Sequence, residues 1–379
     1  LSLHDALPIS ALERAGVETS VHYPIPPHRQ PAYAATLGAL NTPPPEVSYV
    51  VLAYGQGEYI GDSVKTALSQ EHDSMEFIFS DDCSEDDTYD RMKAAVARHA
   101  RPGQRITVVR NERNLGLGPH LAEAIGRARG QIIVFQAGDD LATPGRTARI
   151  ASVFRSSPDV MMVMHNVRVV DASGRTRRAR YLASPPDFTG PLGELVSRGF
   201  PGLVGASEAI RREVFDRFGR FAYRDCYEDY AFAFRAALLG RISYLDEVLI
   251  DWRHHGSNMS HFVDFASADA AAKFRGHFLR NLKAHITFLR QHLVDLDRCA
   301  QSASSGAVHA AVRAKLARHR LELAARSAAP WRLVALTARH AFRHGATALW
   351  VGRQLVIRAL HQAYFWAVAR NVRNSLNQP

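Results

Sequence analysis

Three pairs of adjacent acidic residues have the types and positions that could carry chemistry. They are Asp81-Asp82, Asp139-Asp140 and Glu228-Asp229. Carboxylate oxygens are preferred ligands of Mg²⁺ and Mn²⁺, and such a cation can bind substrate phosphates. A carboxylate can also act as a general base that takes a proton from a hydroxyl group. The first and third pairs have a second interpretation, because acidic side chains also favour helix N-termini without any catalytic part.

The elements that must position these pairs are short strands alternating with helices. Strands are expected over residues 47–54, 76–80, 105–110 and 131–135, and helices near 58–70, 88–98 and 119–129. This alternation predicts an α/β fold, with a mostly parallel sheet covered by helices on both faces. Ligands of such sheets bind at the carboxyl ends of the strands. Asp81-Asp82 and Asp139-Asp140 each follow a strand, so we expect them at one acidic crevice.

The order of these motifs resembles that of the family 2 glycosyltransferases over residues 46–262. The resemblance rests on residues 52–60, 81–88, 114–116 and 138–146, the last of which contain Gly138-Asp139-Asp140 followed by Pro144 and Arg146. It implies a GT-A fold and an inverting, hexosyltransferase-type enzyme that uses a nucleotide-diphosphate sugar, with a UDP-sugar as the expected donor. The acceptor is expected to be a saccharide or a lipid-linked saccharide in surface polysaccharide assembly.

The same resemblance implies roles for the residues at the strand ends. Asp140 is expected to bind a divalent cation, Mg²⁺ or Mn²⁺, and Asp139 to contact the ribose or the metal shell. Asp82 is expected to accept a hydrogen bond from the base, and Tyr54, next to Ala53, to lie against that base. The cation would offset the charge of the leaving diphosphate.

The second half of the domain is expected to supply the acceptor side and to close the site. Residues 205–215 resemble the segment that precedes the family's catalytic base. Glu228-Asp229 resembles its Glu-Asp motif, so Asp229 is expected to be the base and Glu228 to position or hydrogen-bond a substrate. Residues 251–260 resemble the closing segment, in which Arg253 could pair with the diphosphate and His255 could complete the metal shell. A histidine pair on the surface is the other interpretation of this segment.

Two other functions remain open on the sequence alone. One is a nucleotide-sugar-binding protein without catalytic activity. The other is a nucleotidyltransferase, which shares the sheet and the acidic metal site. A nucleotidyltransferase usually carries a glycine-rich loop with Lys or Arg after the first strand, and residues 52–58 contain no basic residue.

Residues 1–45 are expected to be a leader that does not belong to the enzyme. Residues 2–9 resemble the translation of a sequencing adapter, and residues 10–35 resemble the C-terminal end of a DegT/DnrJ/EryC1 sugar aminotransferase. Such an aminotransferase needs a Schiff-base lysine, and residues 10–45 contain none. This piece therefore cannot act as an aminotransferase by itself. The other interpretation is a disordered leader rich in proline, which ends in a Pro-rich linker.

Residues 266–379 are expected to form a basic, amphipathic, helical tail after the catalytic domain of residues 46–265. The tail contains eighteen Lys and Arg and four Asp and Glu, so its net charge is +14, whereas the rest of the chain has a net charge of −4. Apolar residues recur there at helical spacing. The helices could pack on the catalytic domain or on a second subunit of a homo-oligomer, or they could contact an anionic membrane surface. Nucleic-acid binding is not expected, because no recognised module accompanies the charge.

Cysteine usage and hydropathy bear on the compartment. The three cysteines stand far apart without metal-like spacing, so neither a disulfide framework nor a zinc site is predicted. Apolar runs stay shorter than the roughly 18 residues that a membrane span needs. We therefore expect a cytoplasmic protein, which would be peripheral at the inner face of the cytoplasmic membrane if the tail contacts lipid.

Overall fold

The computed structural model describes residues 44–200, 202–256, 258, 270–299 and 305–327. The adapter-like and aminotransferase-like segments lie outside these residues, as does the tail beyond residue 327. The structure therefore does not test the expectations for those segments. The described residues from Pro45 onward belong to one compact unit.

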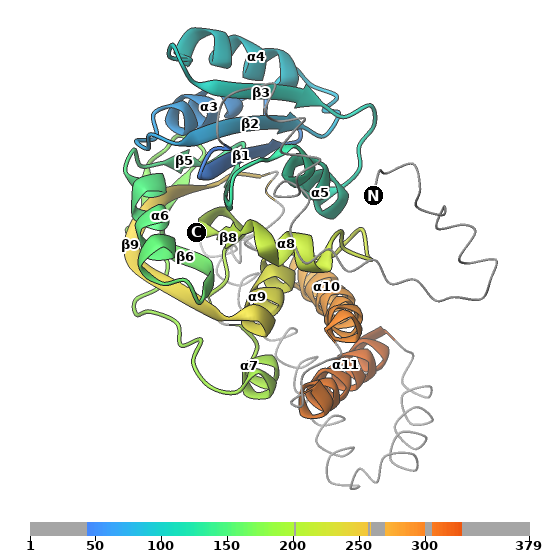
Figure 1. The fold of residues 1–379 in the computed structure, drawn as a ribbon. Helices are drawn as coiled ribbons and strands as arrows, with labels where there is room; N and C mark the ends of the chain where they lie inside the picture. The colour runs from blue at the N-terminus through green and yellow to red at the C-terminus, as the bar shows by residue number, and fades with distance from the viewer. Residues whose placement is uncertain (1–43, 201, 257, 259–269, 300–304, 328–379) are drawn as a thin grey trace, which may run out of the picture. The chain divides into compact units, whose positions relative to one another are not determined.

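Four parallel strands form the first half of the sheet (Figure 1). They are β1 (Val47–Ala53), β2 (Met75–Asp81), β3 (Arg105–Arg110) and β4 (Ile132–Ala137), in the order β3-β2-β1-β4. The strand β1 shows why these segments become strands. It is rich in β-branched and aromatic side chains, and nearly all of its residues are buried because helices cover both faces of the sheet. These four strands confirm the sequence prediction to within two residues at each end.

The second half of the sheet contains both antiparallel and parallel strand pairs. It contains β8 (Ala209–Arg211), β6 (Val160–Asp171), β9 (Arg241–His254) and β5 (Leu141–Ala142), with β7 (Thr176–Arg178) paired to β6. The short strand β8 runs antiparallel to both β4 and β6 and joins the two halves. The long strands β6 and β9 then pair in parallel.

Helices cover both faces of the sheet, as expected. One face packs against α3 (Ile60–Leu68), α4 (Thr88–His99) and α6 (Arg146–Ser156). The other face packs against α5 (Leu117–Arg127), α8 (Arg212–Phe218) and α9 (Glu228–Leu239), and α7 (Leu192–Arg198) adds to this core. The α/β fold class predicted from the sequence is therefore confirmed.

Two long helices, α10 (Ala270–Arg298) and α11 (Ser305–Ser327), extend the second core (Figure 1). Leu282, Leu289 and Leu296 of the predicted apolar stripe are buried. The buried guanidinium of Arg235 in α9 binds the carboxylate of Asp295 in α10 through two hydrogen bonds, of 2.9 and 3.0 Å. This part of the tail therefore packs on the α/β domain. Among the described residues, no helix is long and apolar enough to cross a membrane.

Histidines buried between α9, α10 and α11 predict acid sensitivity. Burial, with the nearby His319, lowers the pKa of His285 to about 4, and burial also lowers that of His292 well below its usual value. The unfolded chain therefore binds more protons than the folded chain below about pH 6.5, so stability falls as pH falls from 6.5 toward 4.

We expect His285→Phe to reduce this loss by about 1–2 kcal/mol between pH 7 and pH 5, measured by urea unfolding at both pH values. His99→Gln on α4 is the matched control, because it removes a histidine outside this cluster. An equal pH dependence in the wild type and in His285→Phe would contradict the assignment.

Candidate functional site

A backbone hydrogen bond joins the carboxyl ends of β1 and β2, next to the place where the base of a nucleotide is expected to bind. The backbone N–H of Asp82 donates to the carbonyl of Ala53 at 2.9 Å. Ala53 is buried, whereas Tyr54, the next residue, is 49% exposed and is the one exposed large hydrophobic side chain of the described chain. Its ring is therefore accessible to a planar ligand, as its predicted role requires.

Asp82 holds the loop that follows β3. Its Oδ1 accepts hydrogen bonds from the Asn111 side chain at 2.7 Å and from the Leu115 N–H at 3.0 Å, and its Oδ2 accepts one from the Gly116 N–H at 2.8 Å. A carboxylate has roughly four acceptor positions, so about one remains for a ligand. The structure thus gives Asp82 a role in shaping the crevice, and its contact with a base stays a prediction.

Asp139 and Asp140 follow β4 and contact the closing segment after β9. Asp140 Oδ1 accepts a hydrogen bond from the Arg253 N–H at 2.8 Å, whereas its Oδ2 is buried and has no hydrogen-bond partner among the described residues. Burial, with the neighbouring charge of Asp139, raises the pKa of Asp140 well above its usual value. A buried, unpaired carboxylate oxygen is costly unless a ligand satisfies it.

His255 and Arg253 both pack against the Asp139 segment. His255 Nε2 lies 2.9 Å from Asp139 Oδ2, and its ring stacks on Tyr59 with centroids 4.4 Å apart. The Arg253 guanidinium donates to the carbonyls of Asp139 and Ala172, each at 3.0 Å. His255 therefore lies beside Asp139, and the Arg253 guanidinium is hydrogen-bonded to backbone carbonyls. Their predicted contacts with metal and diphosphate stay predictions.

The Asp140 carboxylate fits a divalent cation that is shared with a diphosphate. The described residues contain no group of three or more His, Cys, Asp and Glu that could hold a metal by itself. Mg²⁺, however, is usually bound by one or two carboxylates together with substrate phosphates and waters. Asp140 Oδ2 supplies an unpaired oxygen of the required kind.

Glu228 and Asp229 begin α9, with both side chains partly accessible to solvent. Burial raises the pKa of Asp229 to about 6, and burial together with the Asp229 charge raises that of Glu228 to about 8. Asp229 therefore ionises first and is mostly a carboxylate at neutral pH. The pair can hold one proton and accept another, which is what a general base requires.

Comparison with known proteins identifies the domain. Residues 48–219 match the model of the Glycosyl transferase family 2. The chain contains a family 2 glycosyltransferase domain.

Relatives of this domain differ in how much of their length they share with the chain. An uncharacterized glycosyltransferase, alr2836, of Nostoc sp. is 26% identical over 60% of this chain and 70% of its own length. The succinoglycan biosynthesis protein ExoO of Rhizobium meliloti is 33% identical over 39% of this chain and 41% of its own length. The structure of a mannosyltransferase of Pyrobaculum calidifontis with GDP-Man and Mn²⁺ is 17% identical, with a TM-score of 0.48 over 90% of this chain and 95% of its own.

Glu208 is a residue of the glycosyltransferase domain whose role the sequence does not predict. It is fully buried, and neither of its carboxylate oxygens has a hydrogen-bond partner among the described residues. Burial and the charges of Asp229 and Glu228 raise its pKa well above the usual value. Glu208 is thus a third acid beside the candidate base. Its one signal in the sequence is an acidic residue directly before the apolar residues of β8.

Glu208 also connects β4 with the segment that approaches Glu228. Its carbonyl accepts a hydrogen bond from the Phe135 N–H at 3.1 Å, and Phe135 lies in β4 just before the Asp139-Asp140 turn. Gly205 lies so close to Glu228 that an added Cβ would come within 2.5 Å of Glu228 Oε1. The segment of residues 205–208 therefore contacts both Glu228 and the strand β4 that leads to Asp139-Asp140.

Arg146 connects the two halves of the sheet from within the core. Its buried guanidinium donates to His165 Nε2 at 2.8 Å, to the Tyr49 hydroxyl at 3.0 Å and to the carbonyl of Ala206 at 2.9 Å. Burial and the Arg146 charge lower the pKa of His165 well below its usual value, so the imidazole is neutral and can accept this bond. The sequence pattern contained Arg146 but could not show these partners, which come from distant elements.

Proposed function

We propose that this protein transfers a hexose-type sugar from a UDP-sugar, with inversion, to a hydroxyl of a saccharide or lipid-linked acceptor in polysaccharide assembly. The observation that carries the proposal is the presence of two acidic centres, one after β4 with an unpaired carboxylate oxygen and one at the start of α9 with a carboxylate that ionises near pH 6. The relative ExoO is named for succinoglycan biosynthesis, which supports the polysaccharide role.

On the donor side, Tyr54 and Ala53 would receive the base, and Asp82 would offer its remaining acceptor position to it. Asp140 would hold a divalent cation, Mg²⁺ or Mn²⁺, with Asp139 and His255 beside it and with Arg253 positioned to meet the diphosphate. The cation, when bound, offsets the negative charge of the leaving diphosphate. The contacts of Arg253 with the carbonyls of Asp139 and Ala172 fix the closing segment over this turn.

On the acceptor side, Asp229 would take the proton from the acceptor hydroxyl as that oxygen attacks the anomeric carbon. The attack comes from the side opposite the leaving nucleotide diphosphate, so the configuration at that carbon inverts. Glu228 keeps its proton at neutral pH and can donate a hydrogen bond to the acceptor. Asp229 can therefore carry the negative charge of the pair.

We further propose that residues 46–265 form the catalytic domain and that the basic helical region after it serves contact with an anionic membrane surface. This arrangement would place the site where lipid-linked acceptors are found. The packing of α10 on the domain supports a fixed attachment of that region.

We expect Asp140→Asn to weaken activation by Mn²⁺ about a hundredfold, because the amide loses the charge that binds the cation. The measurement is initial rate against Mn²⁺ concentration with a UDP-sugar donor. Asp171→Asn, at the partly exposed end of β6, is the matched control and should leave the Mn²⁺ dependence unchanged. Equal Mn²⁺ dependence in Asp140→Asn and the wild type would contradict the assignment.

A donor screen tests the proposed function directly. Thermal unfolding is measured with Mn²⁺ and a panel of nucleotide sugars, and turnover of each stabilising donor is then measured with saccharide acceptors. We expect UDP-sugars to raise the unfolding temperature and to release UDP. Stabilisation only by a different nucleotide sugar would contradict the donor, and stabilisation without turnover on any acceptor would contradict the enzymatic function.

A further inference from the structure

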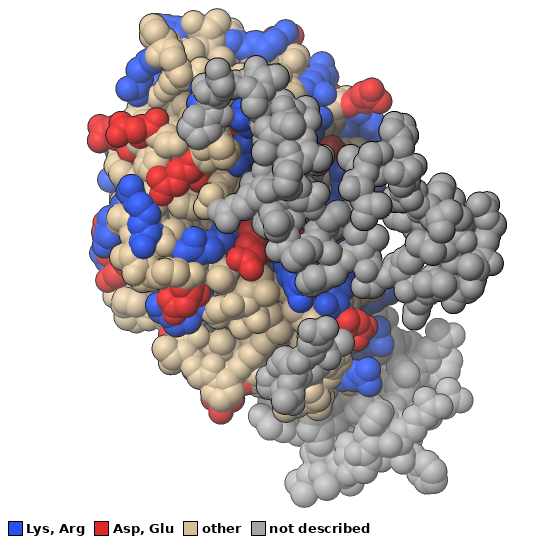
Figure 2. Space-filling view, in the orientation of Figure 1, with Lys and Arg blue, Asp and Glu red and all other residues tan. Residues whose placement is uncertain are grey.

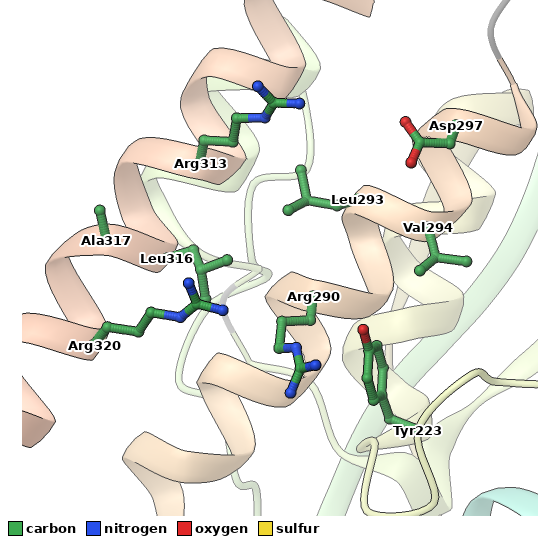
Figure 3. Close-up of a pocket in the computed structure, with 9 residues that line it drawn as sticks. All are labelled: Tyr223, Arg290, Leu293, Val294, Asp297, Arg313, Leu316, Ala317 and Arg320. Carbon is green, nitrogen blue, oxygen red and sulfur yellow. The ribbon is translucent and has the colours of Figure 1, made fainter.

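A groove lies between α10 and α11, on elements separate from the acidic site (Figure 3). Its volume is about 360 Å³, which is within the range of small-ligand pockets. The apolar part of its lining comes from both helices and includes Leu293, Val294, Leu316 and Ala317. Leu316 is buried, and Leu293 and Val294 stay partly accessible, so the groove has an apolar floor.

Three arginines stand around this floor. Arg290 comes from α10, and Arg313 and Arg320 come from α11, two helical turns apart. All three are exposed, and the guanidinium of Arg290 lies 4.5 Å from the centre of the Tyr223 ring. Figure 3 shows Arg313 and Arg320 extending from α11 toward α10.

The groove has an excess of positive charge, because three arginines and one acid line it. None of the three guanidiniums has a salt bridge within the described part of the chain, and the one acid of the lining, Asp297, pairs with His309 at 3.3 Å. Elsewhere on the described surface, basic and acidic side chains are interspersed, and many of them pair (Figure 2). A cluster of unpaired arginines beside an apolar floor suits a ligand with a phosphate and a hydrocarbon part.

The chain's own C-terminal segment does not match this charge. Residues 328–379 contain seven arginines and no Asp or Glu, so like charges disfavour their entry into the groove. A nucleic acid would match the charge, but binding of single strands relies on exposed aromatic rings for stacking. The one aromatic ring of the lining, Tyr223, is covered by Arg290.

We propose that the groove between α10 and α11 binds the phosphate headgroup and the adjoining chain of an anionic phospholipid. The positive charges of Arg290, Arg313 and Arg320 around the groove attract the anionic headgroup, and Leu293, Val294 and Leu316 contact the hydrocarbon. The inference rests on the proposed membrane contact and gives it a defined site. It stands apart from the donor site, because its test measures lipid binding and not sugar transfer.

The test uses the full chain and a soluble lipid. Calorimetric titration with dihexanoylphosphatidylglycerol below its micellar concentration is compared with dihexanoylphosphatidylcholine, inorganic phosphate and a single-stranded RNA. We expect binding of phosphatidylglycerol alone. The double variant Arg313→Glu/Arg320→Glu should raise its Kd about tenfold or more, because it reverses two of the three positive charges around the groove.

Two further variants separate the groove from general charge. Ala317→Trp fills the groove without changing charge, and it should also raise the Kd about tenfold. Arg318→Glu changes an exposed arginine of α11 outside the lining, and it should leave the Kd within about twofold. Far-UV circular dichroism and unfolding temperature confirm that each variant folds.

Several results would overturn the proposal. Equal binding of inorganic phosphate would show an anion site without a lipid part, and tighter binding of RNA that Ala317→Trp weakens would assign the groove to nucleic acid. An equal loss in Arg318→Glu would show an effect of net charge alone. Unchanged affinity in Ala317→Trp, or no binding of phosphatidylglycerol by the wild type, would place lipid contact elsewhere or remove it.

Discussion

Asp229→Asn is expected to lower kcat about 10³-fold while leaving the KM of the donor nearly unchanged. Asparagine has almost the same shape as aspartate, but it cannot accept the proton that the acceptor hydroxyl must lose. The side-chain oxygen of residue 229 can still accept the hydrogen bond from the Tyr230 N–H, now 2.7 Å, so the start of α9 should persist. The loss would therefore report chemistry and not unfolding.

The pH profile gives a second test of the same carboxylate. Since the pKa of Asp229 is raised to about 6, kcat/KM should fall about tenfold per pH unit below that value, as the base becomes protonated. Asp225→Asn, at an exposed position just before the pair, is the control and should keep both kcat and the profile. Wild-type turnover by Asp229→Asn would contradict the base assignment. If the donor screen also failed, the proposed function itself would be contradicted.

The first half of the sheet could be predicted from the sequence because its signals are local. Runs such as that of β1 and the helical pattern of α3 carry their periodicity within a single segment. The positions of Asp81-Asp82 and Asp139-Asp140 then follow from topology, since the parallel strands β2 and β4 end on the same side of the sheet. The end of β9 brings His255 to the same place, where it lies 2.9 Å from Asp139.

The remaining features depend on contacts between distant segments. The antiparallel insertion of β8 between β4 and β6 involves only three residues, too few for a periodic signal. Glu208 looks like an ordinary polar residue of a loop, and only the packed sheet shows that it is buried beside Asp229. The hydrogen bonds from the loop after β3 to the Asp82 carboxylate likewise form only when the chain folds back, and no local sequence pattern encodes this.

A buried ion pair attaches the basic helical region to the α/β domain. Arg235 lies two turns after Asp229 on α9, and its fully buried guanidinium binds the equally buried Asp295 carboxylate on α10. Gln291 donates a hydrogen bond to Asp295 at 2.9 Å and accepts one from the Ala222 N–H at 2.7 Å. The helix α9, which carries the candidate base Asp229, is therefore held in place by α10, which also lines the groove between α10 and α11.

Asp295→Asn is expected to lower the free energy of unfolding by about 3–5 kcal/mol, because it leaves the buried charge of Arg235 without its partner. Urea unfolding at neutral pH measures this loss. Asp159→Asn is the matched control: it breaks the exposed pair with Arg241 and should leave the free energy of unfolding nearly unchanged. Replacing both partners, as Arg235→Met/Asp295→Leu, should recover much of the stability, since no buried charge then remains unpaired. A loss in Asp295→Asn no larger than in Asp159→Asn would show that α10 does not hold α9 through this pair.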